Sequence, residues 1–117
     1  MHMASAEETD WPQIVRLYDV LERVQPSPIV ALNRAVAIAM VVGAGPALAL
    51  VDALDARGDL DGYHLFHATR ADLLRRLGRM TEAASSYTRA IALAANDAER
   101  RFLERRLREV QSAGSSV

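Results

Sequence analysis

Two histidines and a group of arginines are the residues of this chain whose types and spacing could do chemistry. His64 and His67 lie three residues apart, so on a helix they would share one face. A zinc site needs a further ligand, and Asp61 and Asp72 are the nearest candidates in the sequence. Because a His-x-x-His pair alone is a weak signal for metal, we expect one histidine to pack between helices and the other to lie on the surface. We predict no metal and no cofactor.

The second half of the chain is rich in arginine. Ten of the 14 basic side chains lie in residues 70–117, and the chain has no lysine. Acidic residues are interleaved at helical spacing, as Glu104 is between Arg100 and Arg108, a pattern typical of a solvated helix face. Nucleic-acid-binding surfaces usually add exposed aromatic residues or a recognition helix. We therefore expect no direct contact with nucleic acid. Arg75, Arg76 and Arg106 fit better the capture of an acidic peptide or a carboxyl terminus.

Signals of catalysis or membrane insertion are missing from the sequence. It has no cysteine, no Ser/His/Asp arrangement in a recognisable turn, and no glycine loop that matches a phosphate cradle. No apolar run reaches the length of a membrane span, and no signal peptide is visible. We predict that the domain is not an enzyme, that it does not enter a membrane, and that it is cytoplasmic.

Capping and turn residues divide the chain into helices. Asp10, Ser27 and Asn96 are predicted N-caps, and glycines or prolines separate the apolar-periodic stretches. Every link is short, which forces neighbouring helices to lie antiparallel. We predict an all-α domain over residues 9–111, with a tag or disordered N-terminus at 1–8 and a flexible tail at 112–117. The predicted helices are about 11–24, 28–42, 46–57, 63–77, 81–94 and 97–111.

The helical hairpins are predicted to be copies of one another. Ala71, Gly78, Ala83 and Tyr87 fall at positions where a tetratricopeptide repeat has small, turn-forming or large residues. Thirty-six residues upstream, Ala35 echoes Ala71. Such hairpins stack into a short solenoid with a concave groove, lined by the first helix of each hairpin. The predicted partner-binding residues of this groove are Leu32, Val36, Met40, Asp72, Arg75, Arg76, Phe102 and Arg106.

One polar pair interrupts the most apolar helix. Asn33 and Arg34 lie within 28–42, where we expect burial on most sides. Buried polar groups need hydrogen-bonding partners. We predict that Arg34 pairs with an acidic residue, either Asp19 or Asp52, in a structural network.

Four segments in this order resemble a known family: "TDWPQIVRLYDVL", "PSPIVALNRAVAIA", "GYHLFHATRADLLRRLGR" and "ERRFLERRL". Together, over residues 9–110, they resemble the C-terminal tetratricopeptide-like extension of an actinobacterial subgroup of extracytoplasmic-function (ECF) sigma factors. Met40 departs from the pattern, where an acidic residue is expected. The resemblance implies a regulatory domain without catalytic residues, which modulates transcription initiation by RNA polymerase while the promoter-binding regions lie elsewhere in the parent protein.

The resemblance also implies partners. They are the sigma-factor core domains of the parent chain, RNA polymerase, or a regulatory protein. From the residues alone, a second copy of the chain is a further candidate for covering the apolar end of the groove, as a homodimer. The alternative is a stand-alone adaptor that captures peptides and has no link to transcription.

Overall fold

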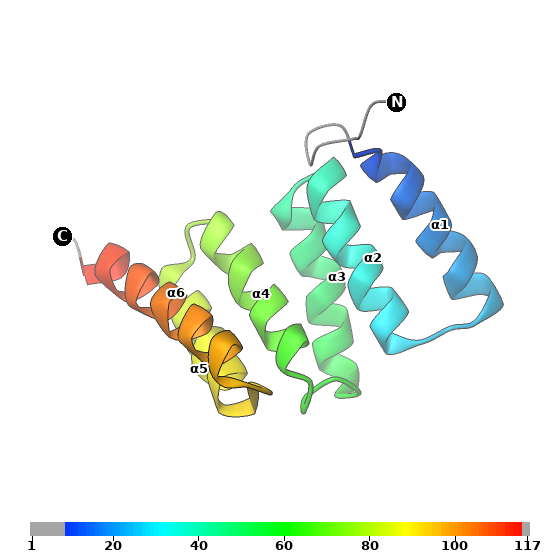
Figure 1. Ribbon diagram of the computed structural model, residues 1–117. Helices are drawn as coiled ribbons and strands as arrows, with labels where there is room; N and C mark the ends of the chain where they lie inside the picture. Colours follow the sequence, from blue (N-terminus) through cyan, green and yellow to red (C-terminus); the bar gives the residue numbers. More distant parts are fainter. Residues whose placement is uncertain (1–8, 116–117) are drawn as a thin grey trace, which may run out of the picture.

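Six helices form the part of the chain, residues 9–115, that this computed structural model describes. Figure 1 shows them in a row, from α1 at one end to α5 and α6 at the other. No strand occurs within the described residues, so the all-α prediction is confirmed. The prediction for residues 1–8 falls outside them. The helices are α1 (Trp11–Val24), α2 (Pro28–Val41), α3 (Ala44–Arg57), α4 (His64–Arg76), α5 (Met80–Leu93) and α6 (Asp97–Ser115).

The predicted N-caps are confirmed. The side chains of Asp10, Ser27 and Asn96 each accept a backbone N–H from the first turn of α1, α2 and α6. Each cap satisfies one of the amide groups that a helix start leaves without an intrahelical acceptor. At α6, Glu99 also reaches back and accepts the N–H of Ala95, which closes the start of the helix from both sides.

Two predicted boundaries are corrected. Helix α3 begins at Ala44, two residues before the predicted start at Pro46, because Gly43 alone makes the turn with a φ of 108°. Pro46 fits inside the first turn, where a helix leaves its N–H groups unbonded in any case. Helix α6 continues past Gln111 to Ser115, so four residues of the predicted tail are helical.

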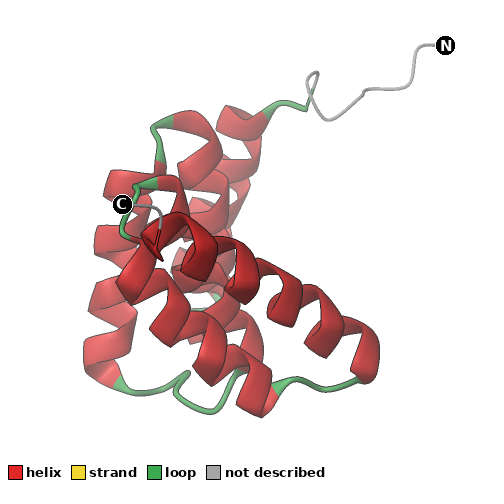
Figure 2. Cartoon of the chain, turned by 90° about the vertical axis from the view of Figure 1, so that its left-hand side faces the viewer, coloured by secondary structure: helices red, strands yellow, loops and turns green. Residues whose placement is uncertain are grey.

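Alanines set the spacing between the helices. Ala35, Ala47, Ala71 and Ala83 are each fully buried, at the positions where we predicted small residues. Each helix packs against the next along the chain and runs antiparallel to it, as Figure 1 shows. Figure 2 shows the row from the end formed by α5 and α6. A side chain of one carbon lets two helix backbones approach closely while longer side chains interdigitate beside it. The stacked-hairpin arrangement predicted from the repeat is therefore present.

The junction between α3 and α4 is the least closely packed of those between consecutive helices, and a charged bridge crosses it. Arg70 of α4 donates from Nε to Asp52 Oδ1 of α3 at 2.9 Å, and from Nη1 to Ser86 Oγ of α5 at 3.0 Å. Ser86 is the one buried polar residue among those described. One side chain thus ties three helices together. Its side chain is 23% exposed, so the arginine-rich half of the chain does not place all of its guanidinium groups on the surface.

A second arginine holds α1 to α2. The Nε of Arg34 donates to Asp19 Oδ1, with Glu22 Oε2 3.9 Å away. This confirms the predicted pairing with Asp19, while Asp52 is taken by Arg70. Asn33 was expected to be buried with Arg34, but it is exposed, because α1 and α3 cover other faces of α2.

Arg70 is expected to be central to stability. An Arg70→Met substitution keeps the apolar stem but leaves the Ser86 hydroxyl buried without its donor. We expect a loss of about 1–3 kcal/mol in the free energy of unfolding. For a domain of this size that lowers the Tm by at least about 4 °C, as measured by thermal unfolding followed by circular dichroism.

Arg100→Met is the matched control. Arg100 pairs with Asp97 on the exposed surface of α6, within one helix. We expect its Tm to stay at the wild-type value. Equal Tm values for both variants and the wild type would show that the Arg70 bridge adds nothing.

Candidate protein-interaction groove

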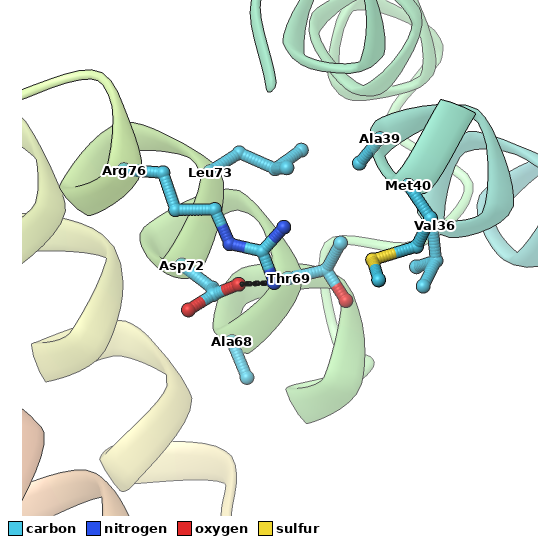
Figure 3. Close-up of a pocket in the computed structure, with 8 residues that line it drawn as sticks. All are labelled: Val36, Ala39, Met40, Ala68, Thr69, Asp72, Leu73 and Arg76. Carbon is cyan, nitrogen blue, oxygen red and sulfur yellow. Dashed lines mark ion pairs between the residues drawn. The ribbon is translucent and has the colours of Figure 1, made fainter. Parts of the chain in front are cut away.

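A hollow of about 200 Å³ opens between α2 and α4. Val36, Ala39 and Met40 of α2 form one wall, as Figure 3 shows, and Ala68, Thr69, Asp72, Leu73 and Arg76 of α4 form the other. The lining is mostly apolar, with a charged edge on the α4 side. We call these eight residues the groove.

The groove stays open because α2 and α4 touch each other only slightly. Helix α3 lies between them in the chain and packs against both, which holds them apart. Val36 and Met40 therefore remain 40% and 47% exposed, although both are large and apolar. Ile29, two turns before Val36 on the same face of α2, is exposed as well. Contiguous exposed apolar side chains of this kind mark interaction surfaces.

Asp72 gathers two arginines at the charged edge. Its Oδ1 accepts Nη2 of Arg75 at 2.6 Å, and its Oδ2 lies 2.9 Å from Nη2 of Arg76. Both arginines follow Asp72 on the same helix, at i+3 and i+4, so α4 itself brings the three together. With one carboxylate between two guanidinium groups, this edge of the groove carries a net positive charge.

Arg75 points inward from this cluster. Its Nε is buried and has no hydrogen-bond partner among the described residues. The hydrogen bond to Asp72 raises the pKa of Arg75 above its usual value, while burial opposes that shift. Arg75 is thus charged at any working pH.

Tyr87 connects the arginines of α4 and α6. Burial raises the pKa of the Tyr87 phenol, and the nearby charges of Arg75 and Arg106 partly offset this. Both arginines therefore lie near the same hydroxyl. On α6, the Arg106 guanidinium stands 5.5 Å from the centre of the Phe102 ring and 3.4 Å from Glu109 Oε1.

Seven of the eight predicted partner-binding residues lie at least partly at the surface of α2, α4 or α6, and Val36, Met40, Asp72 and Arg76 meet in the groove. The prediction that Leu32 binds a partner is corrected: Leu32 is 2% exposed and belongs to the hydrophobic core. It lies three residues before Ala35, on the flank of α2 that turns toward the hairpin crossing. The eight predicted residues did not include Ala39, Ala68, Thr69 and Leu73, which also line the groove.

Both histidines lie within hydrogen-bonding distance of other parts of the fold. His64 Nε2 lies 3.2 Å from Glu99 Oε1, so the start of α4 meets the start of α6. His67 Nε2 lies 2.8 Å from the backbone oxygen of Asp61, at the link before its own helix. Within the described residues no group of three or more His, Cys, Asp or Glu side chains is placed to hold a metal ion.

Comparison with known proteins gives one informative match. The chain is 45% identical over 111 residues to an uncharacterized protein of Rhizobium meliloti (strain 1021). The match covers 95% of this chain but 26% of the relative, so the chain spans about a quarter of that protein's length. No family model matches the chain, and no solved structure matches it. None of the helices in residues 9–115 is long and apolar enough to cross a membrane.

Tyr87 leads to a prediction about alkaline pH. Because its pKa is higher in the folded protein than the usual value near 10, the folded state holds the phenolic proton more tightly. Its contribution to stability is complete below about pH 10 and is lost as the pH rises through the folded value. With no lysine in the chain, few other groups obscure this effect.

The measurement compares the wild type with Tyr87→Phe. Urea unfolding at several pH values from 8 to 11 gives the free energy of unfolding of each. We expect the wild type to lose stability more steeply than Tyr87→Phe above about pH 10, whatever the offset between them at pH 8. Parallel curves would contradict the assignment.

Proposed function

We propose that this domain is the regulatory protein-interaction domain of an ECF RNA polymerase sigma factor, and that its groove is filled by another polypeptide segment. The single observation that supports this most is the exposure of Val36 and Met40 beside a charged cluster. A solvent-exposed hollow of this composition is typical of a protein-binding surface.

The chemistry of the groove defines its occupant. An apolar side chain that enters between Val36, Met40 and Leu73 removes surface from water on both sides, worth about 1.5–3 kcal/mol for a residue the size of leucine. An acidic group beside it would meet Arg76 on the charged edge. The occupant is therefore expected to be a segment with an aliphatic or aromatic anchor followed by a carboxylate.

The link to sigma factors rests on the four ordered segments that resemble their C-terminal extension. The relative from Rhizobium is consistent with a modular role, because there the matching region is part of a much longer protein. In the proposed setting the groove binds the core domains of the parent chain, RNA polymerase or a regulator, and the domain acts in the cytoplasm. Promoter contacts belong to other regions of the parent.

A stand-alone peptide-binding adaptor is the second candidate, because the same groove supports it. The reading frame of the parent gene separates the two. Sigma regions encoded upstream in the same frame favour the first function, and their absence favours the second.

Substitutions in the groove are expected to act like removal of the domain. In transcription assays with RNA polymerase and the full-length parent, deletion of residues 9–115 should change promoter-specific transcript yield. Val36→Glu and Arg76→Glu should shift it in the same direction, by about tenfold if one apolar anchor or one charge contact is lost.

Val42→Glu is the control for these variants. Val42 is an exposed apolar residue at the end of α2, outside the groove, and its substitution should leave the transcript yield unchanged. If the deletion and both groove variants transcribe like the wild type, the regulatory proposal loses its support.

A further inference from the structure

Asp72 is the one acidic residue among those that line the groove. Its Oδ2 lies 2.9 Å from Nη2 of Arg76, the one basic residue of that lining, and Figure 3 shows this ion pair on the α4 wall. Its Oδ1 accepts Nη2 of Arg75 at 2.6 Å. Both carboxylate oxygens are thus engaged by guanidinium groups. An acidic segment that enters the groove must therefore share Arg76 with Asp72.

The fold does not require a carboxylate at position 72. Thirty-six residues upstream, Val36 holds the place in α2 that Asp72 holds in α4. The alanines that precede them, Ala35 and Ala71, are both fully buried, which supports this register. Val36 is 40% exposed and the Asp72 side chain is 32% exposed, so neither position belongs to the core. An aliphatic residue meets the needs of packing in one hairpin, and the carboxylate in the next hairpin therefore has another role.

The two ion pairs of Asp72 differ in exposure. The Arg75 side chain is 28% exposed, and its hydrogen bond to Asp72 is the largest cause that raises the pKa of Arg75. The Arg76 side chain is 42% exposed, at the edge of the groove. Exposed ion pairs are weak because water competes for both groups. Arg76 can therefore leave Asp72 for another carboxylate at little cost, while Asp72 keeps Arg75.

A second copy of the chain offers a poor ligand for this edge of the groove. Asp55, Asp61 and Glu104 form no ion pair within residues 9–115, so a second copy could present these carboxylates. However, the leucines beside Asp55 and Asp61, Leu54 and Leu60, are buried and cannot serve as anchors. Glu104 lies among arginines of its own helix, whose charge would repel the arginine of the groove. A separate protein is therefore the better source of an acidic segment with an apolar anchor.

We propose that Asp72 sets the charge preference of the groove, by competing with the carboxylate of a separate partner protein for Arg76. The partner inserts an apolar anchor between α2 and α4 and places its carboxylate on Arg76. Asp72 stays on Arg75 and repels the incoming charge, which keeps the affinity for acidic segments below what Arg76 alone would give. This inference rests on the proposed function, because it concerns the same groove, and it adds the residue that limits binding there.

The test uses two short synthetic peptides, both acetylated and amidated, in which a leucine anchor is followed by glutamates in one and by glutamines in the other. NMR titration of the complete chain measures both affinities. We expect the wild type to prefer the glutamate peptide by about two- to threefold. Asp72→Asn should raise that preference by a further factor of about three to ten, because the repulsion is removed while an amide oxygen still accepts from Arg75.

Two further variants act as controls. Asp97→Asn removes the same charge from an exposed ion pair on α6, outside the groove. At physiological ionic strength a charge at that place is screened, so the preference should stay at the wild-type value. Arg76→Gln removes the contact itself and should abolish the preference. Circular dichroism should show that all three variants remain folded.

Four results would overturn the inference. The first is weaker binding of the glutamate peptide by Asp72→Asn than by the wild type, since Asp72 would then position the arginines for the partner. The second is a preference that Asp72→Asn leaves unchanged. The third is no binding of either peptide by the wild type or by Asp72→Asn. The fourth is a concentration-dependent dimer in sedimentation that Val36→Glu abolishes, since a second copy would then be the occupant.

Transcription decides the proposed function separately. If Val36→Glu changes the transcript yield while Asp72→Asn leaves the peptide preference unchanged, this inference fails and the proposed function stands. If deletion of residues 9–115 leaves the transcript yield unchanged while Asp72→Asn raises the preference, the proposed function fails and the groove still selects acidic segments.

Discussion

The close approach of antiparallel helices through alanine is the constraint on which the rest of the structure depends. Ala35, Ala47, Ala71 and Ala83 are fully buried where the helices of the two complete hairpins cross. A larger residue at these places would push the backbones apart and leave the neighbouring leucines without contacts. Because each helix is held on one or two sides only, stacking in a row leaves other faces uncovered. The groove and the exposed apolar face of α1 are both consequences of that arrangement.

Arginine side chains hold neighbouring helices together in this domain, a role that large apolar side chains have in other helical proteins. Alanine-rich crossings bury little surface per residue, and a long side chain that reaches two neighbours compensates at the loosest junction. Arg34 fastens α1 to α2, and Arg70 fastens α4 to both α3 and α5. The carboxylates that receive them come from other helices, so these pairs fix the positions of helices relative to one another. Arg75 and Arg76 differ, because their carboxylate partner Asp72 lies on their own helix, so these pairs do not fix one helix against another.

The sequence predicted most of the fold because helix ends and small residues are local signals. Asp10, Ser27 and Asn96 cap helices through contacts within one turn, and such contacts can be read from neighbouring residues. The groove was harder to predict. Leu32 and Val36 are both apolar and one turn apart on α2, and only the direction from which α3 approaches decides which is buried. The bridge made by Arg70 could not be predicted for the same reason, since its partners lie 18 and 16 residues away in the sequence.

Helix α2 both packs against α1 and lines the groove. One flank holds α1 through Arg34, and another presents Val36 and Met40 to the groove. Helix α1 has no buried residue of its own, so its position depends on α2 and on the two acidic residues that Arg34 contacts.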